Sequence, residues 1–183
     1  MRYVLRGGNP PVRAILLIES GSRHILEQVL PSLRATWGEE IFIDLVTCYA
    51  GLPQGFRAET TRIYRVADYQ GRALRRQLYR QLGQNQYALA GVICSGEPIM
   101  TKWKWAVASH VPAKVFIINE NADYFWFDRH HWSVLRKFVL YRSGLAGAGA
   151  VRTLVELACF PFTLLYLLLY ATAVHTRRAL RRS

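Results

Sequence analysis

Cysteine is scarce in this 183-residue chain, and the metal-binding and disulfide patterns that cysteine forms are missing. Cys48, Cys94 and Cys159 include no CxxC pair, and none lies near a histidine at metal-ligand spacing. We therefore expect no disulfide scaffold, no metal site and no cofactor. Each cysteine lies in an apolar stretch, where a free thiol is expected to be a small buried hydrophobe in a reducing compartment.

Acidic residues are also few, 12 against 24 lysines and arginines, which gives a formal charge of +12. A disordered basic tail is excluded because 51% of the residues are hydrophobic. The length allows one domain of ordinary size. The charge indicates a polyanionic partner, either nucleic acid, an anionic membrane surface or a phosphate-bearing substrate. No specific nucleic-acid partner is expected, because the charge comes without a helix-turn-helix, zinc-finger or RNP-type motif.

Several catalytic and targeting motifs are absent. The chain has no GxGxxG, no GK[ST] ending and no nucleophile elbow. Residues 1–12 lack the long apolar run of a secretory signal and are expected to be a flexible lead-in.

A long uncharged run is present near the C-terminus. Residues 157–174 carry no charge, and the apolar stretch extends back to Leu154. As a helix it would span about 27 to 32 Å, the thickness of a bilayer core. We expect a membrane segment at 152–175 and a basic tail at 176–183 that contacts lipid headgroups. Pro161 leaves a single span or a re-entrant hairpin open, and a buried helix of a soluble domain is the remaining alternative.

Short apolar runs alternate with helical patterns between residues 13 and 131. Strands are expected at 13–19, 41–49, 61–66, 87–94 and 113–118, and helices at 23–37, 71–82 and 99–110. This alternation predicts a Rossmann-like α/β domain with a mostly parallel sheet and flanking helices. The aromatic run at 124–127 is expected to be an interfacial loop. Residues 132–151 are expected to form an amphipathic interfacial helix and a Gly/Ala elbow.

Polar residues follow three of the expected strands, where an open parallel sheet binds ligands. Glu19, Glu97 and Glu120 are candidates for a general base or for binding sugar hydroxyls. The expected ligand-binding residues beside them are Ser20, Gly21, Ser22, Ser95, Gly96, Asn119 and Asn121. The alternative is that these residues are ordinary caps and turn formers.

Basic residues cluster on the expected helices and in the tail. Either a solvated face or a contact with anionic membrane lipids accounts for them. They are Arg72, Arg75, Arg76, Arg80, Arg136, Lys137, Arg142, Arg177, Arg178, Arg181 and Arg182.

Residues 13–128 resemble the N-terminal half of GT-B glycosyltransferases, most nearly the heptosyltransferases of lipopolysaccharide assembly. The strand AILLIES, a Gly-containing turn and the helix segment LPSLRATW carry the likeness, together with QLGQNQYALAGVIC. The family's catalytic Asp is absent, since Ile25 occupies the corresponding position, and the neighbouring His24 is the candidate replacement. The donor-binding half is absent as well.

The resemblance implies a bacterial inner-membrane protein. The basic residues on both flanks of the membrane segment, without a signal for export, predict that the soluble domain lies on the cytoplasmic face. In such a protein a partner subunit would bind the nucleotide sugar, and the acceptor would be a lipid-linked molecule or a glycan. The alternative is a non-catalytic, membrane-anchored accessory protein with the same fold.

Overall fold

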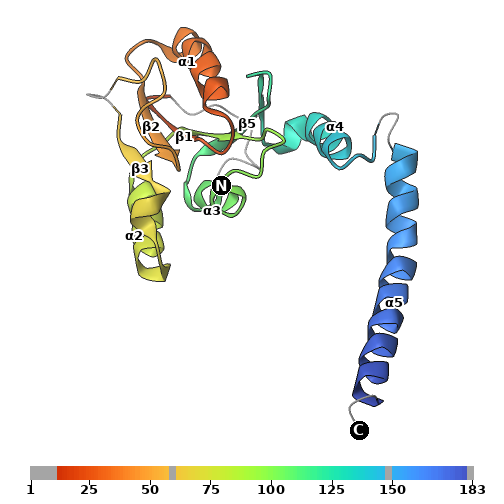
Figure 1. Ribbon diagram of the computed structural model, residues 1–183. Helices are drawn as coiled ribbons and strands as arrows, with labels where there is room; N and C mark the ends of the chain where they lie inside the picture. The colour runs from red at the N-terminus through yellow and green to blue at the C-terminus, as the bar shows by residue number, and fades with distance from the viewer. Residues whose placement is uncertain (1–11, 58–60, 147–149, 181–183) are drawn as a thin grey trace. The chain divides into compact units, whose positions relative to one another are not determined.

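The computed structural model describes residues 12–57, 61–146 and 150–180 (Figure 1). The expected lead-in therefore lies outside the described residues except for Val12. The chain divides into two compact units, Met1–Ser133 and Val134–Ser183.

The first unit is built on a six-stranded, mostly parallel sheet. Its parallel strands are β1 (Ala14–Ile18), β2 (Phe42–Thr47), β3 (Ile63–Arg65), β4 (Leu89–Ile93) and β5 (Lys114–Ile118). The strand order is β3-β2-β1-β4-β5-β6. Every residue of β4 and β5 is buried, because helices cover both faces of the sheet. The predicted α/β class and parallel sheet are confirmed.

The sixth strand, β6 (Tyr124–Trp126), pairs antiparallel with β5. The expectation of an interfacial loop at 124–127 was therefore wrong for these three residues. A turn that includes Ala122 at a φ of 61° reverses the chain before β6. Tyr124 and Trp126 then pack against the buried ring of Phe116 in β5.

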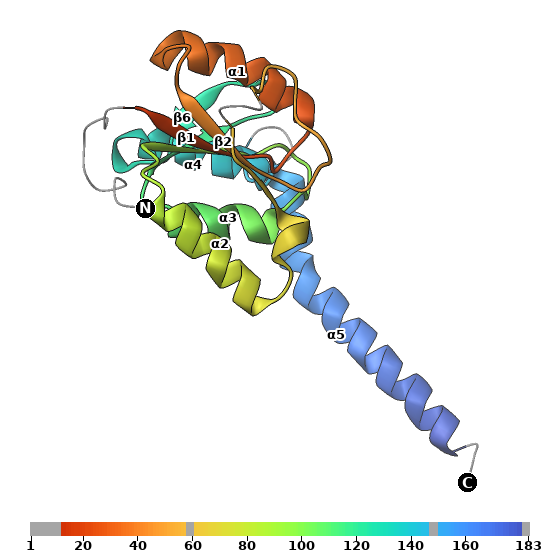
Figure 2. The ribbon, with the colours of Figure 1, turned by 90° about the vertical axis from the view of Figure 1, so that its left-hand side faces the viewer.

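Helices cover the two faces of the sheet separately, as Figure 2 shows. On one face, α1 (Arg23–Trp37) buries Ile25, Leu26, Val29, Leu30 and Leu33, which join Ile15, Leu17, Ile43 and Leu45 in one core. On the other face, α2 (Arg72–Gln84) and α3 (Thr101–His110) pack against each other. They contribute the buried residues Leu78, Leu82, Val107 and Ala108. Each such leucine stabilises the fold by about 1.5–3 kcal/mol. Two short 3-10 helices, η1 (Val66–Tyr69) and η2 (Arg129–His131), complete this unit.

The helix α4 (Trp132–Arg142) confirms the helix expected after residue 131. In the second unit, α5 (Ala150–Leu180) is a single helix of 31 residues that continues through Pro161. The structure thus has the continuous helix and not the hairpin. Its segment Leu154–Thr172 is long and apolar enough to cross a membrane, and none of it is buried.

The cysteines differ in their surroundings. Cys94 is buried, as expected, but Cys48 and Cys159 are exposed. The expectation of burial was wrong for Cys48 because it follows the last residue of β2, where the chain leaves the sheet. It was wrong for Cys159 because it lies in α5, whose apolar segment is unburied.

Candidate functional site

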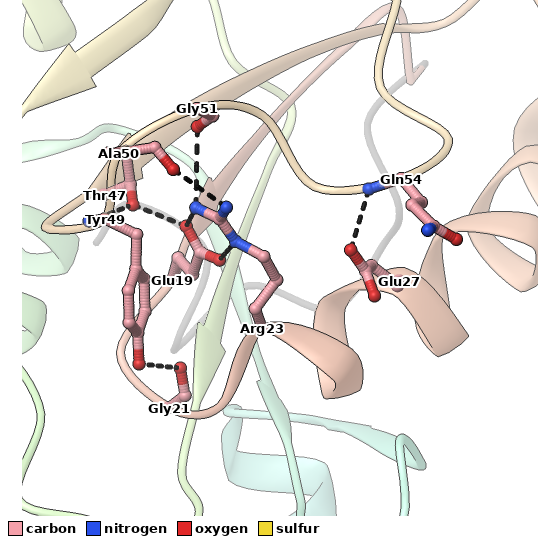
Figure 3. Close-up of polar contacts among 9 residues, drawn as sticks. All are labelled: Glu19, Gly21, Arg23, Glu27, Thr47, Tyr49, Ala50, Gly51 and Gln54. Carbon is pink, nitrogen blue, oxygen red and sulfur yellow. Dashed lines mark hydrogen bonds and ion pairs between the residues drawn. The ribbon is translucent and has the colours of Figure 1, made fainter.

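Glu19 is fully buried directly after β1. Its Oε1 accepts a hydrogen bond of 2.9 Å from Nε of Arg23 in the first turn of α1, and its Oε2 accepts one from the Thr47 hydroxyl (Figure 3). The hydrogen bond to Glu19 is the main cause that raises the pKa of Arg23. Glu19 therefore joins the ends of β1 and β2 to α1.

Arg23 also holds the loop that follows β2. Its Nη1 donates to the carbonyl of Ala50 at 2.9 Å, and its guanidinium lies 5.1 Å from the ring centroid of Tyr49. The Tyr49 hydroxyl in turn donates to the carbonyl of Gly21 at 3.3 Å (Figure 3). Tyr49 was not among the predicted site residues, because its only signal in the sequence is an aromatic residue just after a strand end.

Glu97 forms a second group of hydrogen bonds at the same end of the sheet. Its carboxylate accepts hydrogen bonds from the hydroxyl of Ser22, which immediately precedes α1, and at 3.1 Å from that of Ser95. The hydrogen bond from Ser22 is the main cause that lowers the pKa of Glu97, and the hydrogen bond from Ser95 adds to it. Glu97 is therefore ionised at neutral pH, which suits an acceptor of hydrogen bonds.

The turn between β1 and α1 packs tightly on the end of β4. The Ser20 hydroxyl donates to the carbonyl of Ile93 at 2.7 Å. A Cβ on Gly21 would lie 2.5 Å from both Ile93 Cγ2 and Ser95 Oγ, so glycine permits this approach. The structure thus brings Ser20, Gly21, Ser22, Ser95 and Glu97 together.

The remaining predicted residues lie nearby or on the neighbouring strand end. Gly96 and His24 are exposed. Asn119, after β5, accepts hydrogen bonds on Oδ1 from the backbone N–H groups of Asn121 and Asp123, at 3.0 and 2.9 Å. Asn119 is therefore a turn former, while Glu120 and Asn121 are exposed in that turn.

A groove of about 450 Å³ lies at the opposite end of the sheet, beside Ala14 and Phe42, the first residues of β1 and β2. It is also lined by Tyr87, whose hydroxyl donates to the buried carboxylate of Asp44 at 2.5 Å. Burial, followed by this hydrogen bond, raises the pKa of Tyr87. None of the predicted site residues lines this groove.

A buried ion pair joins β5 to the beginning of η2. Lys114 Nζ lies 3.3 Å from Asp128 Oδ2, and both side chains are buried. The other oxygen of Asp128 contacts Nδ1 of His131 at 2.6 Å. Among the residues that the structure describes, no group of three or more histidines, cysteines or carboxylates could hold a metal ion.

The predicted membrane-surface residues that the structure describes lie on three helices. The side chains of Arg72, Arg75, Arg76 and Arg80 in α2 are exposed, as are those of Arg136, Lys137 and Arg142 in α4. Arg177 and Arg178 belong to α5, and Arg181 and Arg182 lie outside the described residues.

No protein-family model, no curated protein and no solved structure matches this chain. The resemblance to glycosyltransferases therefore stays a prediction.

Proposed function

We propose that this chain is the membrane-tethered subunit of a glycosyltransferase-type enzyme for bacterial envelope glycan or glycolipid synthesis. The observation that carries the membrane tether is the segment Leu154–Thr172, with a mean hydropathy of 1.9 and no burial. Its 19 residues span about 28 Å as a helix, close to the thickness of a bilayer core. The α/β domain then lies on the cytoplasmic face of the inner membrane, next to lipid-linked acceptors.

The order of strands supports a ligand site in a Rossmann-like domain. The strands β2 and β3 lie on one side of β1, whereas β4 and β5 lie on the other. Open parallel sheets bind ligands at such a reversal, beyond the carboxyl ends of the strands. Here Ser22 and Ser95, which both donate hydrogen bonds to Glu97, follow β1 and β4 beside that position. We propose that these residues bind sugar hydroxyls and that Glu97 is the candidate base.

A second candidate function is a non-catalytic accessory subunit with the same fold and tether. The internal ion pair of Glu19 favours it, because this carboxylate already has Arg23 and Thr47 as partners. A carboxylate held in this way would have to break a buried ion pair before it accepted a proton from a substrate. Of Glu19 and Glu97, the carboxylates that follow β1 and β4, Glu97 is therefore the candidate base if this subunit is catalytic.

Ligand binding separates the two functions. Calorimetry should be performed on the full chain in lipid nanodiscs, with a nucleotide sugar or a lipid-linked acceptor as the ligand. Each titration is run on the chain by itself and again with a partner protein, the product of a neighbouring gene that encodes a nucleotide-sugar-binding half. The enzyme subunit binds one of these ligands, and Glu97→Gln weakens binding by about tenfold or more through loss of a charged hydrogen bond. Glu40→Gln, at an exposed position after α1, is the matched control and leaves binding unchanged. Absence of binding under every condition would eliminate the enzyme and retain the accessory function.

A further inference from the structure

The outer surface of the α2–α3 pair carries positive charge without any acidic residue. We define the α2–α3 face as the exposed cations Arg72, Arg75, Arg76, Arg80 and Lys102, together with the aromatic side chains between the two helices. Neither helix contains Asp or Glu, so no ion pair within the two helices offsets this charge. Leu78 and Leu82 of α2 are buried in the core, whereas the four arginines of α2 are exposed to solvent.

Aromatic rings connect the two helices on this face. Tyr79 stacks on the imidazole of His110 with centroids 4.2 Å apart, and it meets Trp103 edge-on at 6.4 Å. The guanidinium of Arg75 lies 5.6 Å from the centroid of the Trp103 ring. Figure 2 shows α2 and α3 side by side beneath the sheet, so these contacts span neighbouring helices. Trp103 and Tyr79 are both half-buried beside these arginines. Proteins are enriched in Trp and Tyr at the membrane interface.

We propose that the α2–α3 face docks the domain on anionic phospholipid headgroups of the membrane that holds α5. The inference rests on the proposed membrane tether, which keeps the domain within reach of the bilayer. The cations meet the surface charge of an anionic leaflet, and Trp103 and Tyr79 lie at the depth where amphipathic rings are favoured. Nucleic acid is the less favoured partner, because the sequence has no helix-turn-helix, zinc-finger or RNP-type motif, and Tyr79 and Trp103 already contact His110 and Arg75.

Hydrogen exchange of the full chain in nanodiscs tests the docking. Discs of neutral phosphatidylcholine are compared with discs that contain phosphatidylglycerol, at low salt. Docking slows the exchange of α2 and α3 amides about tenfold in the anionic discs, and 0.5 M salt removes the difference because it screens exposed charges. Equal exchange rates in the two discs would overturn the proposal.

Charge reversal identifies the residues responsible. Arg75→Glu with Arg76→Glu should weaken docking by at least about 25-fold, since each cation contributes about fivefold. Arg72→Glu with Arg80→Glu should do the same without disturbing the Trp103 contact. The matched control, Arg65→Glu with Arg129→Glu, changes the net charge equally at exposed positions outside the face and retains the protection. A control that loses as much protection as the test variants would contradict the assignment of the face.

Two further outcomes separate this proposal from its alternatives. Alkaline extraction of the same full-length protein from vesicles reports the tether alone, so failure of α5 and failure of docking are distinguishable. Protection of α2 and α3 by added RNA in neutral discs, without protection by anionic lipid, would assign the face to nucleic acid and overturn the proposal.

Discussion

Replacing Arg23 by methionine tests the buried ion pair that joins β1 to α1. The substitution retains an unbranched side chain but leaves the Glu19 carboxylate, which is fully buried, without its cation. Breaking a buried pair in this way costs 3–5 kcal/mol when both partners are enclosed. Because the Arg23 side chain is 27% exposed, we expect the lower end, about 3 kcal/mol of the free energy of unfolding.

The assay is urea unfolding of the full chain in mild detergent, followed by tryptophan fluorescence at neutral pH. Adding Glu19→Gln to Arg23→Met should restore part of the loss, because the stranded charge is gone. The matched control is Arg57→Met, which removes the exposed pair with Glu39 and should cost at most about 1 kcal/mol. An Arg23→Met protein as stable as the Arg57→Met control, or a double variant that recovers nothing, would refute the reasoning.

The remaining predictions concern pH and packing. Burial opposes ionisation of Asp128, but hydrogen bonds from His131 and Lys114 outweigh it and lower its pKa. Ionised Asp128 therefore contributes to the free energy of unfolding, and this contribution should be lost as the pH falls below about 4. Asp128→Asn should make that decline shallower in urea titrations, and identical pH profiles would contradict the account. Gly21→Ala should cost about 1–3 kcal/mol of the free energy of unfolding through overpacking against β4. Gly83→Ala, whose Cβ would lie 3.6 Å from the carbonyl oxygen of His110, should be neutral or stabilising, and equal melting temperatures for the two variants would exclude overpacking.

The sequence predicted the parallel strands because their apolar runs are local signals that any covered parallel sheet produces. It missed β6, since three aromatic residues become a strand only through pairing with β5, which periodicity does not reveal. At the site, the chain order placed Ser22 and Glu97 at neighbouring strand ends, but their hydrogen bond spans 75 positions and depends on how closely Gly21 packs against β4. The ion pair between Glu19 and Arg23 could not be predicted, because residues 19–22, which bring the two together, form neither helix nor strand.

The central claim is that α5 tethers an α/β domain to a membrane, and cell fractionation with alkaline extraction tests it most directly. The full chain should stay in the membrane pellet, because Leu154–Thr172 is long and apolar enough to cross a membrane. A chain ending after Ser143 should be mostly soluble at moderate salt. If the full chain is extracted as readily as the truncated chain, the tether and the function built on it are contradicted.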